Sequence, residues 1–195
     1  MRYFRRLVFL ATGAGFIVAG SLVAQSPASL ASAPLHRHDP NQIILAKIHA
    51  ADLAEMHAGA LAASKGRRPE VRAYGRRLYD DDQFAECRVT AVAREKGLSL
   101  DPPAPAPAPD EAAMQQSRRR AAERLRNLSG SAFDRAFLDA TLHGHDETIA
   151  TLQQEEPLLT DLQTRSLVDQ LIPILRQHEA LAYDLRLYEG PAVRH

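Results

Sequence analysis

The chain has 195 residues, of which 45% are hydrophobic and 25% charged, as expected for one globular domain with a short appendage. Its 24 basic and 24 acidic residues cancel, which excludes the electrostatic signature of a nucleic-acid-binding protein. The single cysteine, Cys87, excludes an intrachain disulfide framework.

The N-terminal segment has the pattern of an export signal. Three arginines in the first six residues precede an apolar run over residues 7–24, which ends in small side chains. We therefore expect a signal peptide over residues 1–24, a flexible linker over 25–38, and a destination in the periplasm or cell envelope. Because the apolar run is just long enough to span a bilayer, an uncleaved membrane anchor stays open as an alternative.

Four long amphipathic helices are predicted from apolar periodicity and from turn signals. Asp39 before Pro40 is typical of a helix start, Ser131 with Asp134 fits a capping box, and Asp161 can cap the last helix. The expected helices lie at 40–64, 69–96, 131–155 and 162–189.

The connections between these helices predict their arrangement. Short turns join the first helix to the second and the third to the fourth, whereas a Pro-rich crossover over residues 98–110 separates the two pairs. A polar segment at 111–127 is expected to form a short, solvated helix over the others. The fold class is therefore all-α: an antiparallel four-helix bundle over residues 39–190, with one long crossover carrying a short extra helix.

One ionisable residue interrupts the apolar seam of each long helix. Apolar side chains recur there in alternating steps of three and four, except at Glu55, Asp82, His145 and His178. Counted from the turns, these positions fall within about one or two helical turns of a common height. Isolated buried charges are costly, so we expect the four side chains to converge and pair with each other, a metal or water.

The neighbouring polar residues on the second helix are expected to lie outside this buried cluster. Asp80 and Asp81 are expected to be solvated or paired with Arg76 and Arg77. Cys87 lies off the seam of its helix, so an accessible thiol is expected. In an oxidising compartment that thiol could link two chains into a dimer.

Several segments resemble a family of exported bacterial proteins often labelled predicted outer membrane protein, domain of unknown function 4142. The matching pieces surround the four seam residues and include DLAEMHAGALA, VRAYGRRLYDDD, SGSAFDRAF and IPILRQHEALA. The resemblance implies a ferritin-like four-helix bundle with one long crossover, and no established activity. Where the family pattern has an Asp followed by a His, this chain has Asp82.

Two interpretations of the four residues stay open. In the first they form a buried acid–imidazole cluster in a structural or envelope-stress protein. In the alternative, Glu55, Asp82, His145 and His178 bind one divalent metal ion, such as Zn, Mn or Fe, through two oxygens and two nitrogens. The paired Glu-x-x-His motifs of di-iron bundles are absent, because Leu142 and Leu175 occupy the Glu positions before the two histidines.

Other functions find little support in the sequence. There is no Cys-x-x-Cys-His motif for covalent haem, no phosphate-binding loop, and no nucleophile with an assignable base. These observations favour a non-enzymatic protein without deciding the question. No specific partner is indicated beyond association with the envelope through the N-terminus.

Overall fold

The computed structural model describes residues 39–101 and 109–188. The expected signal peptide, the linker and the middle of the Pro-rich crossover lie outside the described residues. Within them the protein is all-α, as predicted, and contains no strand. None of the described helices combines the length and apolar character needed to cross a membrane.

Five α-helices and one short 3-10 helix make up the described chain. The helices are α1 (Pro40–Lys65), α2 (Pro69–Glu95), α3 (Pro109–Asn127), α4 (Gly130–Glu155), η1 (Glu156–Leu158) and α5 (Leu162–Leu187). Their ends agree with the predicted ranges to within about two residues, the usual uncertainty of helix boundaries.

Two of the predicted caps are present. The Asp39 side chain accepts a hydrogen bond from the main-chain N of Asn41, at 2.9 Å, at the start of α1. The Asp161 side chain accepts from the main-chain N of Thr164, at 2.7 Å, at the start of α5. Both side chains satisfy amide groups that have no partner within the helix.

The predicted capping box at Ser131 is wrong. The N-cap of α4 is Ser129, without a side-chain cap hydrogen bond, and Gly130 follows with a φ of 63°. Asp134 instead accepts hydrogen bonds from the main-chain N of Arg67, at 2.8 Å, and of Arg68, at 3.0 Å. Its carboxylate therefore holds the turn between α1 and α2 against α4, because that turn offers two amides and α4 is near enough to use them.

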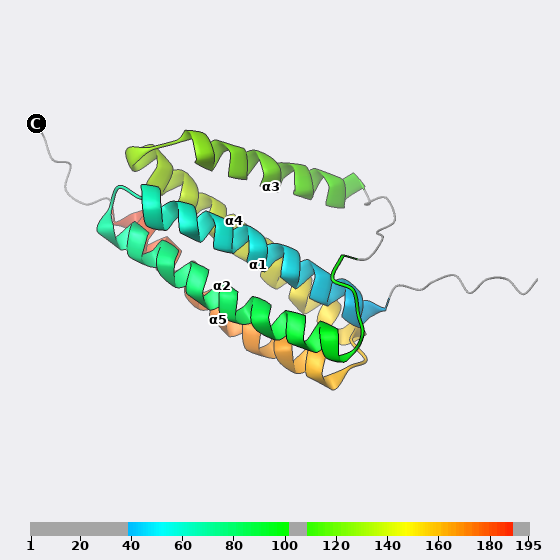
Figure 1. Ribbon diagram of the computed structural model, residues 1–195. Coiled ribbons are helices and arrows are strands. Elements are labelled where there is room, and N and C mark those ends of the chain that lie inside the picture. The colour runs from blue at the N-terminus through cyan, green and yellow to red at the C-terminus, as the bar shows by residue number, and fades with distance from the viewer. Residues whose placement is uncertain (1–38, 102–108, 189–195) are drawn as a thin grey trace, which may run out of the picture. The chain divides into compact units, whose positions relative to one another are not determined.

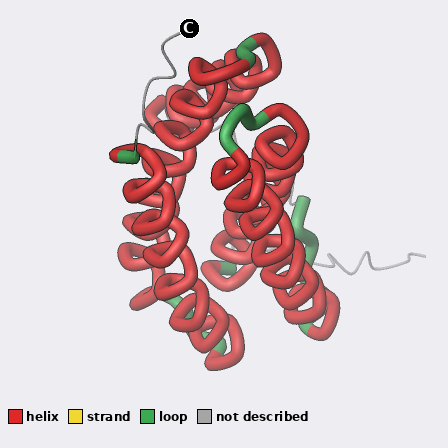
Figure 2. Tube along the Cα trace, turned by 90° about the vertical axis from the view of Figure 1, so that its left-hand side faces the viewer, coloured by secondary structure: helices red, strands yellow, loops and turns green. Residues whose placement is uncertain are grey.

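The four long helices pack against one another in sequence-adjacent and sequence-distant pairs. α1 packs against α2 and α4 against α5, while α1 also contacts α4 and α2 also contacts α5 (Figures 1 and 2). α3 runs along the outside of α1 and α4, as expected for the polar segment (Figure 1). Its last turns contribute one buried side chain, Leu125.

Two glycines let α1 and α2 approach closely. A Cβ atom on Gly59 would lie 2.6 Å from the main-chain oxygen of Gly75, and one on Gly75 would lie 2.6 Å from Cβ of Ala62. Any larger residue at either position would push the two backbones apart. This contact therefore sets the spacing between α1 and α2.

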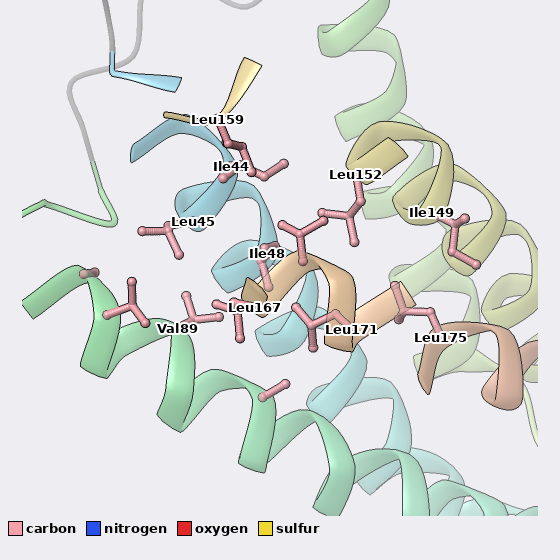
Figure 3. Packing of buried hydrophobic residues seen from close by; sticks show 14 residues of the cluster. Ile44, Leu45, Ile48, Val89, Ile149, Leu152, Leu159, Leu167, Leu171 and Leu175 are labelled. Atoms are coloured by element: carbon pink, nitrogen blue, oxygen red, sulfur yellow. The ribbon is translucent and has the colours of Figure 1, made fainter. Parts of the chain in front are cut away.

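The core consists of two apolar clusters at different heights. The first contains Ile44, Leu45, Ile48, Val89, Leu152, Leu167 and Leu171 among others, from α1, α2, α4 and α5 (Figure 3). The second contains Ala62, Val71, Tyr74, Leu78, Phe133, Phe137, Leu138 and Ala182. Along every one of the four helices, a stretch of buried or half-buried polar residues separates the two clusters.

Candidate functional site

We call the residues between the two apolar clusters the polar layer. It consists of Asp52 and Glu55 on α1, Asp81 and Asp82 on α2, His145 on α4, and His178 on α5. His145 and His178 are completely buried, and Asp52 and Asp82 are exposed by only 8% and 4%. Each of the four long helices α1, α2, α4 and α5 thus contributes at least one ionisable side chain to the interior.

A chain of close contacts links all four helices through the two imidazoles. Nε2 of His178 lies 2.9 Å from Oδ2 of Asp81, and Nδ1 of His178 lies 3.2 Å from Nε2 of His145. The same Nε2 of His145 is 3.2 Å from Oε2 of Glu55. That last contact is a close approach and not a hydrogen bond, because Oε2 of Glu55 has no hydrogen-bond partner.

Hydrogen bonds to main-chain oxygens hold the ring of His145 and the backbone at His178 in place. Nδ1 of His145 lies 3.0 Å from the main-chain oxygen of Thr141, one turn earlier on α4. A carbonyl oxygen can only accept, so Nδ1 of His145 carries a hydrogen and its Nε2 does not when the ring is neutral. Next to the second ring, the Tyr74 hydroxyl donates to the main-chain oxygen of His178 at 2.9 Å.

Burial keeps both rings uncharged near neutral pH. Loss of solvation lowers the pKa of His145 to about 4, and the neighbouring His178 adds to the effect. Burial also lowers the pKa of His178, although its hydrogen bond to Asp81 acts in the opposite direction. Two neutral imidazoles carry two N–H groups, whereas the contacts to Thr141, to Asp81 and between the rings need three hydrogens.

In three carboxyl groups of the layer the pKa is raised, not lowered. Burial raises the pKa of Asp52 and of Glu55 to about 8 and that of Asp82 to about 9. After burial, the largest contribution to each shift is a negative neighbour: Asp82 for Asp52, Asp52 for Glu55, and Glu55 for Asp82. Because each of these pKa values lies above 7, the three carboxyl groups hold their protons near neutral pH.

The three carboxyl groups border a small cavity. It has a volume of about 20 Å³ and is lined by Asp52, Glu55, Asp81 and Asp82, together with apolar side chains of α1, α2, α4 and α5. Oδ2 of Asp52, Oε2 of Glu55 and Oδ2 of Asp82 are buried and have no hydrogen-bond partner. Such unpaired buried oxygens are uncommon in proteins and call for a partner.

The four residues predicted from the seams are placed in two groups. Glu55, His145 and His178 belong to one chain of contacts. Asp82 also lies inside the protein, but it lines the cavity and makes no hydrogen bond or ion pair with either histidine. No three His, Cys, Asp or Glu side chains within residues 39–101 and 109–188 are grouped so that they could hold a metal ion.

Two residues of the layer were missed. Asp81, which was expected to be solvated or paired with arginine, does contact Nε of Arg77 at 3.3 Å, but it also bonds to His178. Asp52 was not considered, although it lies three residues before Glu55 and so shares its helix face. Cys87 is exposed, as its position off the seam predicted.

Comparison with known protein families places most of the chain in one family model. A family model described as "Domain of unknown function (DUF4142)" matches residues 24–185, which is most of the chain. No curated protein and no solved structure matches the chain.

Proposed function

The chain belongs to the family described as a domain of unknown function (DUF4142), and we propose that it is an exported structural protein of the cell envelope. In this proposal residues 39–190 form an antiparallel, ferritin-like four-helix bundle whose interior is held by an acid–imidazole network. Export would remove residues 1–24, whose basic start and apolar middle match a signal peptide. Residues 25–38 would remain as a linker.

One observation carries the structural role. The contacts from Asp81 through His178 and His145 to Glu55 join α2, α5, α4 and α1 in steps of 2.9–3.2 Å. A slip of any helix by one turn would break at least one of these contacts. A buried polar layer of this kind fixes the register of the helices, which two apolar clusters alone specify less strictly.

The geometry of the two histidines favours a structural role over a catalytic one. Each ring nitrogen of the two buried histidines already faces a fixed partner, so neither ring is free to exchange protons with a substrate. The alternative site, one metal held by Glu55, Asp82, His145 and His178, requires more rearrangement. The imidazoles would have to give up their mutual contact, and Asp82 would have to turn toward them.

The stability of variants tests the structural proposal. Removing one partner of a buried pair costs about 3–5 kcal/mol, whereas replacing the whole set by apolar residues is often neutral. We expect His178→Leu alone to lower the free energy of unfolding by that order. Combining it with Glu55→Leu, Asp81→Leu and His145→Leu should recover most of the loss.

Urea unfolding followed by circular dichroism measures these differences. The matched control is His143→Leu, because His143 is also on α4 but its side chain is 68% exposed. A combined variant that loses the sum of the single losses would refute a cooperative network. Fractionation and intact-mass measurement test export: a cytoplasmic protein that retains residues 1–24 would contradict it.

A further inference from the structure

We propose that one end of the helix bundle binds the surface of a bilayer that contains anionic phospholipids. We call it the basic end, and it is formed by residues 62–76, 117–139 and 180–188. Such a surface offers phosphate groups above hydrocarbon, which arginines and exposed apolar side chains can contact together. This role goes beyond the proposed structural one and involves no residue of the polar layer.

Positive charge is concentrated in the basic end. Its three segments hold 12 of the chain's 24 lysines and arginines and only 5 of its 24 aspartates and glutamates, although the net charge of the whole chain is zero. The rest of the chain is therefore negative overall. A separation of this kind turns one end of the protein toward an anionic surface, even though the total charge gives no attraction.

Hydrogen bonds bring the three segments together at one end of the bundle. Nζ of Lys65 donates to the main-chain oxygen of Arg126, at 2.8 Å, which joins the end of α1 to the end of α3. The Arg68 guanidinium donates to the main-chain oxygen of Leu185, at 2.8 Å, on the last turn of α5. Figure 1 shows the turn after α1, the turn after α3 and the end of α5 at the same end.

Five arginines of the basic end are exposed and make no ion pair with another described residue. They are Arg67, in the turn after α1, and Arg119, Arg120, Arg124 and Arg126, in the second half of α3. Lys65 and Arg68, by contrast, are used to hold helix ends. A planar guanidinium can bind a phosphate group through two parallel hydrogen bonds, so the five exposed arginines suit lipid headgroups.

The basic end also exposes apolar and aromatic side chains. On the last turns of α5, Tyr183, Leu187 and Tyr188 are exposed by 55%, 65% and 64%. Tyrosine is enriched where hydrocarbon meets water, because its ring is apolar and its hydroxyl polar. A soluble polyanion would gain nothing from these side chains, whereas a bilayer surface can contact both them and the arginines.

The opposite end of the bundle has apolar side chains without the positive charge. Leu158 and Leu162 are exposed there by 62% and 77%. The segment that contains them, residues 152–165, holds three carboxylates and one arginine. Contact with anionic lipid is therefore unfavourable at this end, and the protein should dock by its basic end.

Sedimentation with vesicles tests the proposal. The mature chain, residues 25–195, is used so that the apolar N-terminal segment cannot insert into the bilayer. It should bind vesicles made of phosphatidylglycerol and phosphatidylethanolamine, and it should not bind vesicles of phosphatidylcholine alone. Binding should weaken roughly tenfold or more between about 50 and about 300 mM salt, because salt screens exposed charges.

A pair of charge-matched variants locates the binding surface. Arg124→Gln combined with Arg126→Gln should weaken binding to the anionic vesicles at least about tenfold, since each basic residue near such a surface strengthens binding about fivefold. The matched control is Arg94→Gln combined with Arg176→Gln, because both arginines are exposed and lie outside the basic end. The control should bind within about twofold of the parent. Equal binding of the two variants, or a parent that ignores anionic vesicles, would overturn the proposal.

Inorganic polyphosphate distinguishes a bilayer from a soluble polyanion. Leu187→Ser should weaken vesicle binding about threefold or more, because binding to a bilayer grows with the apolar area that enters it. The same change should leave binding to polyphosphate as it is in the parent. A parent that binds polyphosphate as tightly as vesicles, with Leu187→Ser altering neither, would assign the surface to a soluble polyanion and contradict the bilayer.

A fluorescent reporter tests the orientation. The chain contains no tryptophan, so Leu187→Trp and Leu158→Trp each introduce a single one, at opposite ends of the bundle. The two leucines are exposed to similar extents, 65% and 62%. With anionic vesicles, the emission of the Leu187→Trp protein should move to shorter wavelength and resist quenching by acrylamide, while that of Leu158→Trp stays unchanged. An unchanged Leu187→Trp spectrum, or an equal shift in both proteins, would overturn the proposal. Neither result bears on the unfolding comparison that tests the polar layer.

Discussion

His145 and His178 meet edge to face in the interior, with ring centroids 5.4 Å apart and planes inclined by 71°. Nε2 of one ring lies 3.2 Å from Nδ1 of the other, and neither side chain is exposed at all. This contact joins α4 to α5 in the interior, between residues that lie 33 positions apart in the sequence.

The protonation of His145 is the first prediction. Because burial lowers its pKa to about 4 and the Thr141 oxygen needs a donor, His145 should be neutral at pH 7 with its hydrogen on Nδ1. Long-range ¹⁵N–¹H spectra of the imidazole distinguish this tautomer from the more common Nε2–H form. The exposed His143 serves as the internal comparison. An Nε2–H tautomer, or a midpoint near the usual 6.5, would contradict the geometry.

The close contact between α1 and α2 gives the second prediction. Gly75→Ala should destabilise the protein by about 1–3 kcal/mol, as overpacking does, because the new Cβ would lie 2.6 Å from Cβ of Ala62. Gly144→Ala is the matched control, since a Cβ there meets nothing within 4 Å. The control should be more stable than the parent by about 0.5–1 kcal/mol, because alanine favours a helix interior. Equal unfolding midpoints for the two variants would show that the contact is not tight.

Asp134 provides the third prediction. Its buried carboxylate accepts two main-chain hydrogen bonds from the turn between α1 and α2, and it lies 3.5 Å from Nε of Arg68. Asp134→Ala should lower the free energy of unfolding by about 1–3 kcal/mol, because two partly buried main-chain amides lose their acceptor. Asp139→Ala, which removes an exposed pair with Arg186, should change it by less than about 1 kcal/mol. Thermal unfolding of both variants decides the matter, and equal effects would contradict the role given to Asp134.

Most of the helical structure could be predicted from the sequence, because it is local. Alternating steps of three and four and the starts at Pro40, Pro69 and Asp161 place α1, α2 and α5 to within about two residues. The seam positions also indicated that Asp82, His145 and His178 would be buried, as they are in the structure.

The contacts between helices could not be predicted in the same way. Asp81 and Asp82 are adjacent, and the rotation of α2 against α5 decides which of them reaches His178. Periodicity on one helix holds no information about that rotation. Asp134 shows the same limit: its position suited a local cap, but the amides of a distant turn were nearer to it.

The pH dependence of stability is the last prediction. The folded-state pKa is raised to about 8 for Asp52 and Glu55 and to about 9 for Asp82, against ordinary values of 3.8 for aspartate and 4.5 for glutamate. Between these limits the folded state holds more protons than the unfolded state. Each of the three groups therefore makes the free energy of unfolding fall as pH rises.

The two histidines act in the opposite direction, but over a lower range. A folded pKa of about 4 for His145, against 6.5 unfolded, makes stability rise between those values and leaves it unchanged above them. His178, whose folded pKa is also lowered, follows the same direction. The carboxyl groups should therefore dominate above about pH 7, where urea unfolding at pH 7, 8 and 9 should show a steady loss of stability. Asp82→Asn should be more stable than the parent at pH 9 and show a shallower decline. A parent whose stability stays level or rises from pH 7 to 9 would mean that these three carboxyl groups are already ionised in the folded state.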